Sequence, residues 1–365
     1  MTEQSILWFE ACRKEHSPQV GGKCASLGEL IAAGIRVPPG FAVTTDAYYD
    51  FLVSAGLKDP ICRVLQRTTA GAPVPEVGRE VREMILAAAV PAEVEGSIRE
   101  AYRELSRRCG VEGLPVAVRS SATLEDLADA SFAGQQDTYL WVRGEDEVVD
   151  KVRACWASLF TDRVIAYREE KGFSHDNVRI SVGVQKMVHA RSSGVLFTLN
   201  PINGDRSKVS INAAWGFGEG VVSGEITPDD FLVDKVTFDI LRRQVVDKPT
   251  AYLLVPDEDR VRMAPVPEGD QSKPSLSDEE IKELTVLARQ IEKHYGQPMD
   301  VEWAVDADLS HPENILILQA RPETVWSKKA APSVVSKSKS ALEAIVGGLM
   351  AGVPVKTQNK CAVST

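Results

Sequence analysis

Two apolar stretches late in the sequence each carry a pair of polar residues two positions apart. Asp300 and Glu302 lie within Met-Asp-Val-Glu-Trp-Ala-Val, and Gln319 and Arg321 follow a run of isoleucine and leucine. Side chains alternate between the two faces of a strand, so residues two apart share a face. Burying such pairs is costly unless a charged ligand or a metal ion satisfies them. Residues 297–321 therefore predict two strands that present polar residues either to a ligand or to solvent, and spacing alone leaves both interpretations open.

Strict alternation also predicts how the second strand divides its side chains. One face would hold Ile315, Ile317, Gln319 and Arg321, and the opposite face would hold Leu316, Leu318 and Ala320. The segment between the two strands, residues 306–313, is rich in turn-forming residues, which favours a hairpin.

Length and charge limit the number of domains and the kinds of partner that this chain can have. A chain of 365 residues has material for two or three domains. Its formal net charge of -10 argues against a nucleic-acid partner bound through phosphate neutralisation. The N-terminus lacks a basic leader followed by an apolar core, and no later run approaches the roughly 20 apolar residues of a membrane span. We expect a cytoplasmic protein with no membrane partner.

The metal-binding residue types are dispersed. Six cysteines occur without any Cys-x-x-Cys spacing, and none of the five histidines pairs with a second histidine or a cysteine at a ligand spacing. The pattern predicts reduced thiols and argues against a structural zinc site.

Residues 16–23 are expected to form a glycine-bearing loop before a helix at residues 24–33. A Walker A loop requires glycine at position 17 and serine or threonine after Lys23, but Ser17 and Cys24 stand there. A Gly-Gly turn that leads into a helix with a lysine in its first turn still suits an anion site. The alternative is a helix N-terminus with a solvated lysine.

A second cation follows an apolar strand at residues 114–121, which delivers Arg119 and two serines at its end. The loop that follows, residues 122–138, contains small residues and Gly134, which let backbone amides approach an anion closely. Further strands are expected at residues 178–188, 193–199, 209–214 and 231–236, and a glycine-rich loop at 215–224 either binds a ligand or simply turns. A helix is expected at about residues 145–171, with an apolar stripe that faces the core. Another is expected at 277–295, with a capping box at Ser277 and Glu280 and a stop at Gly296.

Six motifs in one order resemble the nucleotide-binding N-terminal domain of the phosphoenolpyruvate synthase (pyruvate, water dikinase) family, which pyruvate phosphate dikinase and rifampicin phosphotransferase share. They are Gly-Gly-Lys (21–23), Val-Arg-Ser-Ser-Ala (118–122), Asp-Ala-Ser-Phe-Ala-Gly-Gln (129–135), Ile-Glu-Lys-His-Tyr-Gly (291–296), Met-Asp-Val-Glu-Trp (299–303) and Gln-Ala-Arg-Pro-Glu-Thr (319–324). The resemblance implies an α+β, ATP-grasp fold in which two subdomains clasp ATP. We expect these subdomains at residues 1–188 and 189–326, followed by a linker and tail at 327–365.

The resemblance also implies a role for each matching residue. Lys23, Arg119 and Arg321 resemble catalytic phosphate ligands, and the loop around Gly134, which ends at Thr138, resembles the flap over the phosphates. Gln185 and Met187 match positions against the adenine. Asp300 and Glu302 match the metal side and Gln319 the transferred phosphates, with Glu302 and Gln319 as the expected ligands of Mg2+, or of Mn2+ in its place.

The expected chemistry is phosphoryl transfer, which needs positioning and neutralisation of negative charge more than covalent help from the protein. Members of the family carry a phosphorylatable histidine in a later domain, whereas none of the five histidines here lies after position 311. The resemblance therefore implies an ATP-binding subunit that phosphorylates or pyrophosphorylates a histidine on a separate partner subunit, giving AMP and phosphate. The arrangement is similar to that of phenylphosphate synthase, and the partner would pass the phosphate to a small acceptor such as phenol or pyruvate. Two alternatives stay open: an ATP-sensing module without turnover, and an ATP-grasp ligase that forms an acyl phosphate.

Overall fold

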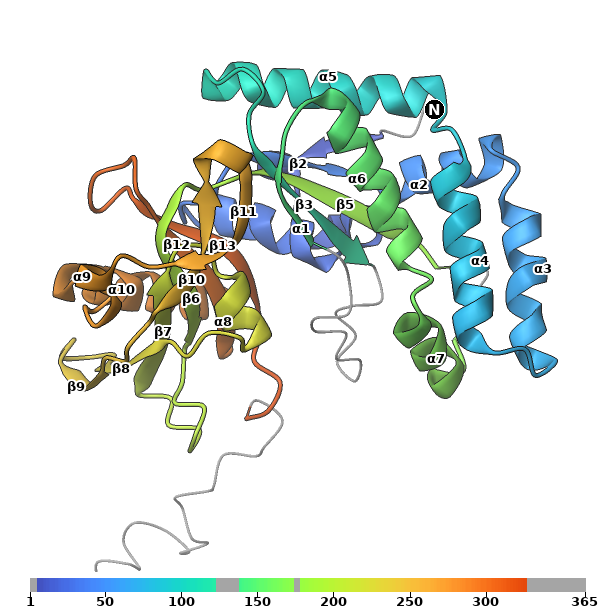
Figure 1. Cartoon of the computed structure of the whole chain (residues 1–365). Helices are drawn as coiled ribbons and strands as arrows, with labels where there is room; N and C mark the ends of the chain where they lie inside the picture. Colours follow the sequence, from blue (N-terminus) through green and yellow to red (C-terminus); the bar gives the residue numbers. More distant parts are fainter. Residues whose placement is uncertain (1–4, 123–137, 174–177, 327–365) are drawn as a thin grey trace, which may run out of the picture. The chain divides into compact units, whose positions relative to one another are not determined.

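Two separate antiparallel sheets, each with its own helices, organise the computed structural model of the chain (Figure 1). The structure describes residues 5–122, 138–173 and 178–326. Separate sheets combined with helices confirm the expected α+β class. Among the described helices, none combines the length and the apolar character needed to cross a membrane.

The first sheet has five strands in the order β1-β2-β5-β3-β4. Their bounds are β1 Ile6–Trp8, β2 Gly40–Val43, β3 Val116–Ala122, β4 Thr138–Val142 and β5 Ile180–Lys186. The helices of this part are α1 Ser17–Ala32, α2 Thr45–Ser54, α3 Lys58–Thr69, α4 Val74–Ala87, α5 Ala92–Cys109, α6 Glu145–Ser158 and α7 Asp162–Lys171, with short 3-10 turns at Phe9–Ala11 and Lys14–His16.

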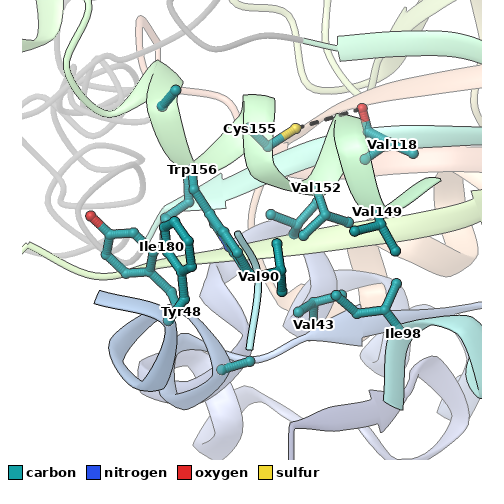
Figure 2. Close-up of a cluster of buried hydrophobic side chains, with 14 of the residues drawn as sticks. Val43, Tyr48, Val90, Ile98, Val118, Val149, Val152, Cys155, Trp156 and Ile180 are labelled. Atoms are coloured by element: carbon teal, nitrogen blue, oxygen red, sulfur yellow. Dashed lines mark hydrogen bonds between the residues drawn. The ribbon is translucent and has the colours of Figure 1, made fainter. Parts of the chain in front are cut away.

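Helices α2 to α6 share one apolar core with this sheet. Trp156 of α6 is fully buried at its centre, stacks on Phe51 at a centroid distance of 4.8 Å and lies beside Tyr48. Figure 2 shows Trp156 and Tyr48 among valines of β2, β3 and α6. The aromatic residues in the apolar stripe of residues 145–171 are therefore accounted for by core packing.

That stripe belongs to two helices rather than to the one that was expected. Helix α6 ends at Ser158 and α7 begins at Asp162. Between them Thr161 adopts extended backbone, with ψ of 152°, and Asp162 occupies the first turn of α7, where a negative charge is favourable. A stripe with helical spacing continues across such a break, so the periodicity concealed it.

The expected loop at residues 16–23 is corrected in part, because residues 17–20 form a first helical piece of α1. Pro18 stands in the first turn of this helix, where proline is tolerated. Gly21 alone has non-helical torsion angles, with φ of 68° and ψ of 167°, so α1 is kinked at this residue. Gly21 therefore divides α1 into two helical pieces, and Lys23 lies in the first turn of the second piece, as the Gly-Gly turn followed by a lysine predicted.

The second sheet has six strands in the order β13-β12-β6-β7-β8-β9. Their bounds are β6 Ala190–Phe197, β7 Lys208–Trp215, β8 Asp229–Asp234, β9 Ile240–Gln244, β12 Met299–Asp306 and β13 Ile315–Pro322. A separate hairpin pairs β10 Thr250–Val255 with β11 Arg260–Pro265, around the 3-10 turn Pro256–Glu258. The helices are α8 Glu219–Ser223, α9 Glu268–Gln271 and α10 Asp278–Tyr295.

Helix α10 begins and ends where the sequence predicted. Ser277 accepts a hydrogen bond from the amide of Glu280, whose side chain accepts one from the amide of Ser277. Gly296 follows the helix in the left-handed region. The apolar side of α10 packs in one core with β12, β13 and α1, so the first helix of the chain joins the core of the second sheet. The predicted subdomain boundary after residue 188 stays a prediction, and it falls between β5 and β6.

The hairpin β12–β13 has a bulge that changes which residues share a face. Glu302 pairs with Gln319 and Trp303 with Ile317, so Leu318 has no partner on β12. An extra residue reverses the alternation beyond it. Ile315, Ile317 and Ala320 therefore pack in the core, whereas Leu318, Gln319 and Arg321 lie on the other side. The expected face shared by Ile315, Ile317, Gln319 and Arg321 is wrong for this reason.

Candidate functional site

A cavity of about 300 Å3 lies between residues of the two sheets. Strands β3, β4 and β5 contribute to its wall from the first sheet, and β6, β12, β13 and helix α8 contribute from the second part. Helix α1 adds one residue, just after its kink. Eight of the ten predicted site residues line this cavity: Lys23, Arg119, Thr138, Gln185, Met187, Glu302, Gln319 and Arg321.

The remaining two predicted residues differ from these eight. Asp300 lies two residues before Glu302 on β12. It forms an ion pair with Arg321 and does not line the cavity. Gly134 lies outside the described residues, as does most of the loop that it was expected to form.

One part of the cavity lining gathers positive charge. The ammonium of Lys23 donates to the carbonyl of Ser120 at 3.2 Å. Arg119, the residue before Ser120 on β3, lies 3.8 Å from Glu302 through its Nη1, and its buried Nε makes no hydrogen bond with any residue that the structure describes. A guanidinium that keeps a buried donor unsatisfied favours a strong acceptor such as a phosphate oxygen.

The hairpin places its polar residues as two cross-strand pairs. Asp300 lies opposite Arg321, and Glu302 lies opposite Gln319. Arg321 donates from Nε and Nη2 to one carboxylate oxygen of Asp300, at 2.8 and 2.7 Å. Burial raises the pKa of Asp300, and the charge of Arg321 acts in the opposite direction. Asp300 therefore holds and orients Arg321, while Glu302 and Gln319 face the cavity together.

Glu302 and Gln319 offer the oxygen atoms that a hard cation prefers. Within the described residues, no group of three or more His, Cys, Asp or Glu side chains is placed to hold a metal ion. A divalent ion bound by Glu302 and Gln319 would have two protein ligands from this hairpin. Mg2+ is commonly held in this way, by one or two carboxylate or amide oxygens together with phosphate oxygens and water. These two residues fit Mg2+ bound jointly with a phosphorylated ligand.

Another part of the cavity lining is apolar and belongs to one hydrophobic cluster. It includes Ala117, Leu140, Met187, Val188, Phe217, Ala304 and Leu318. Phe217 is held by the edge of Trp141, with ring centroids 6.2 Å apart. Buried Gln185 donates through Nε2 to the carbonyl of Pro38 at 3.3 Å, which fixes its side-chain amide. An apolar slot with one fixed amide suits a planar heterocyclic base.

The structure adds cavity residues that the sequence did not single out: Lys186, Ser193 and Glu219. Glu219 opens α8, which occupies residues 219–223 of the glycine-rich loop expected at 215–224, whose role spacing left open. Burial raises the pKa of Glu219, the carboxylates of Glu302 and Glu225 add to the increase, and Arg119 opposes it. The glycine loop was the available signal, since it brings a carboxylate into a cavity that already contains Glu302.

Comparison with known proteins agrees with this geometry. Residues 17–341 match the family model described as "Pyruvate phosphate dikinase, AMP/ATP-binding domain". The chain is 47% identical over 345 residues to a probable phosphoenolpyruvate synthase of Staphylothermus marinus, a match that covers 88% of this chain and 41% of that protein. It is 43% identical to the phosphoenolpyruvate synthase of Aeropyrum pernix, with 97% of this chain and 46% of that protein covered. For the phosphoenolpyruvate synthase of Aquifex aeolicus the identity is 42%, and the coverage is 96% and 44%.

The chain thus spans less than half the length of these three relatives. Among solved structures, a dinucleotide-forming acetyl-coenzyme A synthetase of Ca. Korarchaeum cryptofilum aligns with 61% of this chain and 80% of its own at 14% identity. The TM-score of this alignment, 0.26, is too low to support a shared fold. The family model covers most of the chain and includes every described residue of the cavity. The chain belongs to the family of pyruvate phosphate dikinase AMP/ATP-binding domains, with their α+β, ATP-grasp type of fold.

Proposed function

We propose that this chain is the ATP-binding part of a dikinase-type phosphotransferase that uses MgATP to pyrophosphorylate a histidine with release of AMP, after which water removes the terminal phosphate and leaves a phosphorylated histidine. The observation that carries the proposal is the division of the cavity. Lys23, Arg119 and Arg321 bring positive charge to the lining, and another part of the lining, beside Gln185, is apolar and clusters with Met187. ATP has this same division between triphosphate and base, and the phosphoenolpyruvate synthases to which the chain is similar bear names of enzymes of this class.

Each residue then has a definite part. Lys23 and Arg119 neutralise and align the phosphates, and Arg321, oriented by Asp300, stabilises the charge on the phosphoryl group that moves. Thr138 lies on the edge strand beside the phosphates. Glu302 and Gln319 would hold Mg2+ or Mn2+, which supplies further neutralisation of the phosphate oxygens when bound.

The acceptor histidine is proposed to come from outside this cavity. Among the described histidines, none lines it, and two that lie elsewhere contact carboxylates: His189 approaches Asp308 and His294 approaches Glu29, both at 3.2 Å. We place the acceptor histidine on a separate subunit, which would pass the phosphate to phenol, pyruvate or another small molecule. Cytoplasmic location stays a prediction.

Product analysis with the histidine-bearing partner tests the proposal. We expect equal amounts of AMP and phosphate, together with a phosphorylated histidine on the partner. ADP as the sole nucleotide product would contradict the proposal and favour an acyl-phosphate ligase. Tight ATP binding without any phosphorylated partner would favour an ATP sensor.

Two substitutions connect the reaction to the cavity. Arg119→Ala and Glu302→Ala should each lower the rate of histidine phosphorylation by at least about a hundredfold, the usual effect of losing one contact to developing charge. Both variants should remain folded. Arg67→Ala is the control, since Arg67 forms an exposed ion pair with Glu80 on helices outside the cavity. A near-normal rate in either cavity variant would contradict the assignment of these residues.

A further inference from the structure

The kink in α1 has a side chain of another strand inserted into it. In an unbroken helix the amide of Cys24 would donate to the carbonyl of Val20, four residues earlier. The non-helical torsion angles of Gly21 interrupt the helix between these two groups. The hydroxyl of Ser121 lies there instead, donating to the carbonyl of Val20 at 2.9 Å and accepting from the amide of Cys24 at 3.4 Å. Insertion of a polar side chain between successive turns is a recognised cause of helix kinks.

The fit between the kink and β3 is close. A β-carbon added to Gly21 would lie 2.1 Å from the carbonyl oxygen of Ser121 and 2.3 Å from its hydroxyl oxygen. Ser121 is 1% exposed, so water cannot replace its hydroxyl without rearrangement of the chain. Glycine at position 21 is therefore needed both for its positive φ and for the approach of Ser121.

The kink sets the direction of Lys23. Lys23 lies two residues after Gly21, lines the cavity and donates to the carbonyl of Ser120. Strand β3 thus positions Lys23 through two contacts. Ser120 accepts a hydrogen bond from its ammonium group, and Ser121 bonds to the backbone of the turn of α1 that carries it. The same strand presents Arg119 to the cavity, so both cations are located by one strand.

We propose that Ser121 is a positioning residue that directs Lys23 toward the phosphates of the bound nucleotide. The proposal rests on the function proposed above. Without the Ser121 hydroxyl, two buried backbone groups lose a hydrogen-bond partner, and α1 would relax toward a regular helix. Lys23 would then leave its place, while the apolar slot for the base would be unchanged.

The test compares Ser121→Ala with Ser181→Ala by calorimetric titration of MgATP and of adenosine. Ser181 lies opposite Ser121 on β5, is fully buried, and its hydroxyl makes no hydrogen bond in the structure, so it is a matched control. We expect Ser121→Ala to weaken MgATP binding about tenfold, the effect of one lost charge-assisted contact, and to leave adenosine binding unchanged. Ser181→Ala should bind both ligands as the wild type does.

A double variant distinguishes positioning from general destabilisation. If Ser121 acts through Lys23, adding Ser121→Ala to Lys23→Ala should weaken MgATP binding by less than about twofold, because coupled residues are not additive. An additive loss, an equal loss of adenosine affinity, or a Ser121→Ala variant that binds MgATP normally would overturn the proposal. A wild-type chain that binds adenosine and MgATP equally would contradict the proposed function itself, and the role of Ser121 with it.

Discussion

At the scale of single residues, removing the charge of Asp300, which pairs with Arg321, should lower the rate of histidine phosphorylation without lowering stability. Burial raises the pKa of Asp300, so the folded protein disfavours its charged form despite Arg321. We predict that Asp300→Asn unfolds at an equal or higher denaturant concentration at pH 7, because a buried charge is removed. Histidine phosphorylation should fall about tenfold, since Arg321 loses a charged partner. Strong destabilisation of this variant would contradict the prediction.

The pKa of Glu29 predicts a pH dependence of stability. A hydrogen bond from the amide of Lys14 lowers the pKa of Glu29 below its ordinary value of 4.5, and His294 contributes in the same direction. A carboxyl whose folded pKa is lowered stabilises the protein above its unfolded pKa, and this stabilisation is lost as pH falls through the folded value. Urea unfolding should show Glu29→Gln to be less stable than the wild type at pH 7, with a difference that shrinks below about pH 4.5. A difference independent of pH would contradict this.

Glu219→Gln should change the stability of the protein in the opposite direction to Glu29→Gln. Burial raises the pKa of Glu219, so its charge opposes folding at neutral pH. Glu219→Gln should therefore be more stable than the wild type at pH 7, and the gain should disappear as pH falls through the raised pKa and the carboxyl takes up a proton. The same urea series measures it, and lower stability of the variant at pH 7 would be inconsistent with the cost of burial.

At the scale of elements, the sequence predicted those features that depend on contacts between residues close together in the chain. The capping box of Ser277 and Glu280 and the glycine after α10 placed both ends of that helix correctly, because each contact joins residues close in sequence. The bulge at Leu318 could not be predicted, since it depends on how β13 pairs with β12. The Gly-Gly turn was a local signal for the break in α1, but the insertion of Ser121 could not be predicted, because Ser121 lies 97 residues beyond Cys24.

The cap of α10 gives a prediction for this scale. Ser277→Ala removes the acceptor for the amide of Glu280 and should lower the free energy of unfolding by about 1 kcal/mol, the usual cost of a lost serine cap. Ser97→Ala is the control: its exposed hydroxyl bonds only to the carbonyl of Glu93 within α5, and its effect should stay within about 0.5 kcal/mol. Equal denaturation midpoints for the two variants would contradict the role of the cap.

At the scale of the whole molecule, the cavity joins residues that lie up to 298 positions apart, from Lys23 to Arg321. Spacing within each strand identified Asp300 and Glu302 on one strand and Gln319 and Arg321 on the other as candidates. It left a solvated hairpin equally open. The family resemblance led to Lys23 and Arg119, which lie in its motifs, and to Gln185 and Met187, which lie outside them, and the structure brings all four to the same cavity. Lys186 and Ser193 were missed because nothing local distinguishes a cavity-lining lysine or serine from a surface one, whereas the glycine-rich loop was the available signal for Glu219.

The central claim is that this cavity binds ATP through its triphosphate, and calorimetric titration of MgATP tests it most directly. We predict saturable binding to the wild-type chain, at least about tenfold weaker binding to Arg119→Ala and to Arg321→Ala, and unchanged binding to the exposed control Arg67→Ala. Absence of binding to the folded wild-type chain, or normal affinity in both cavity variants, would contradict the account.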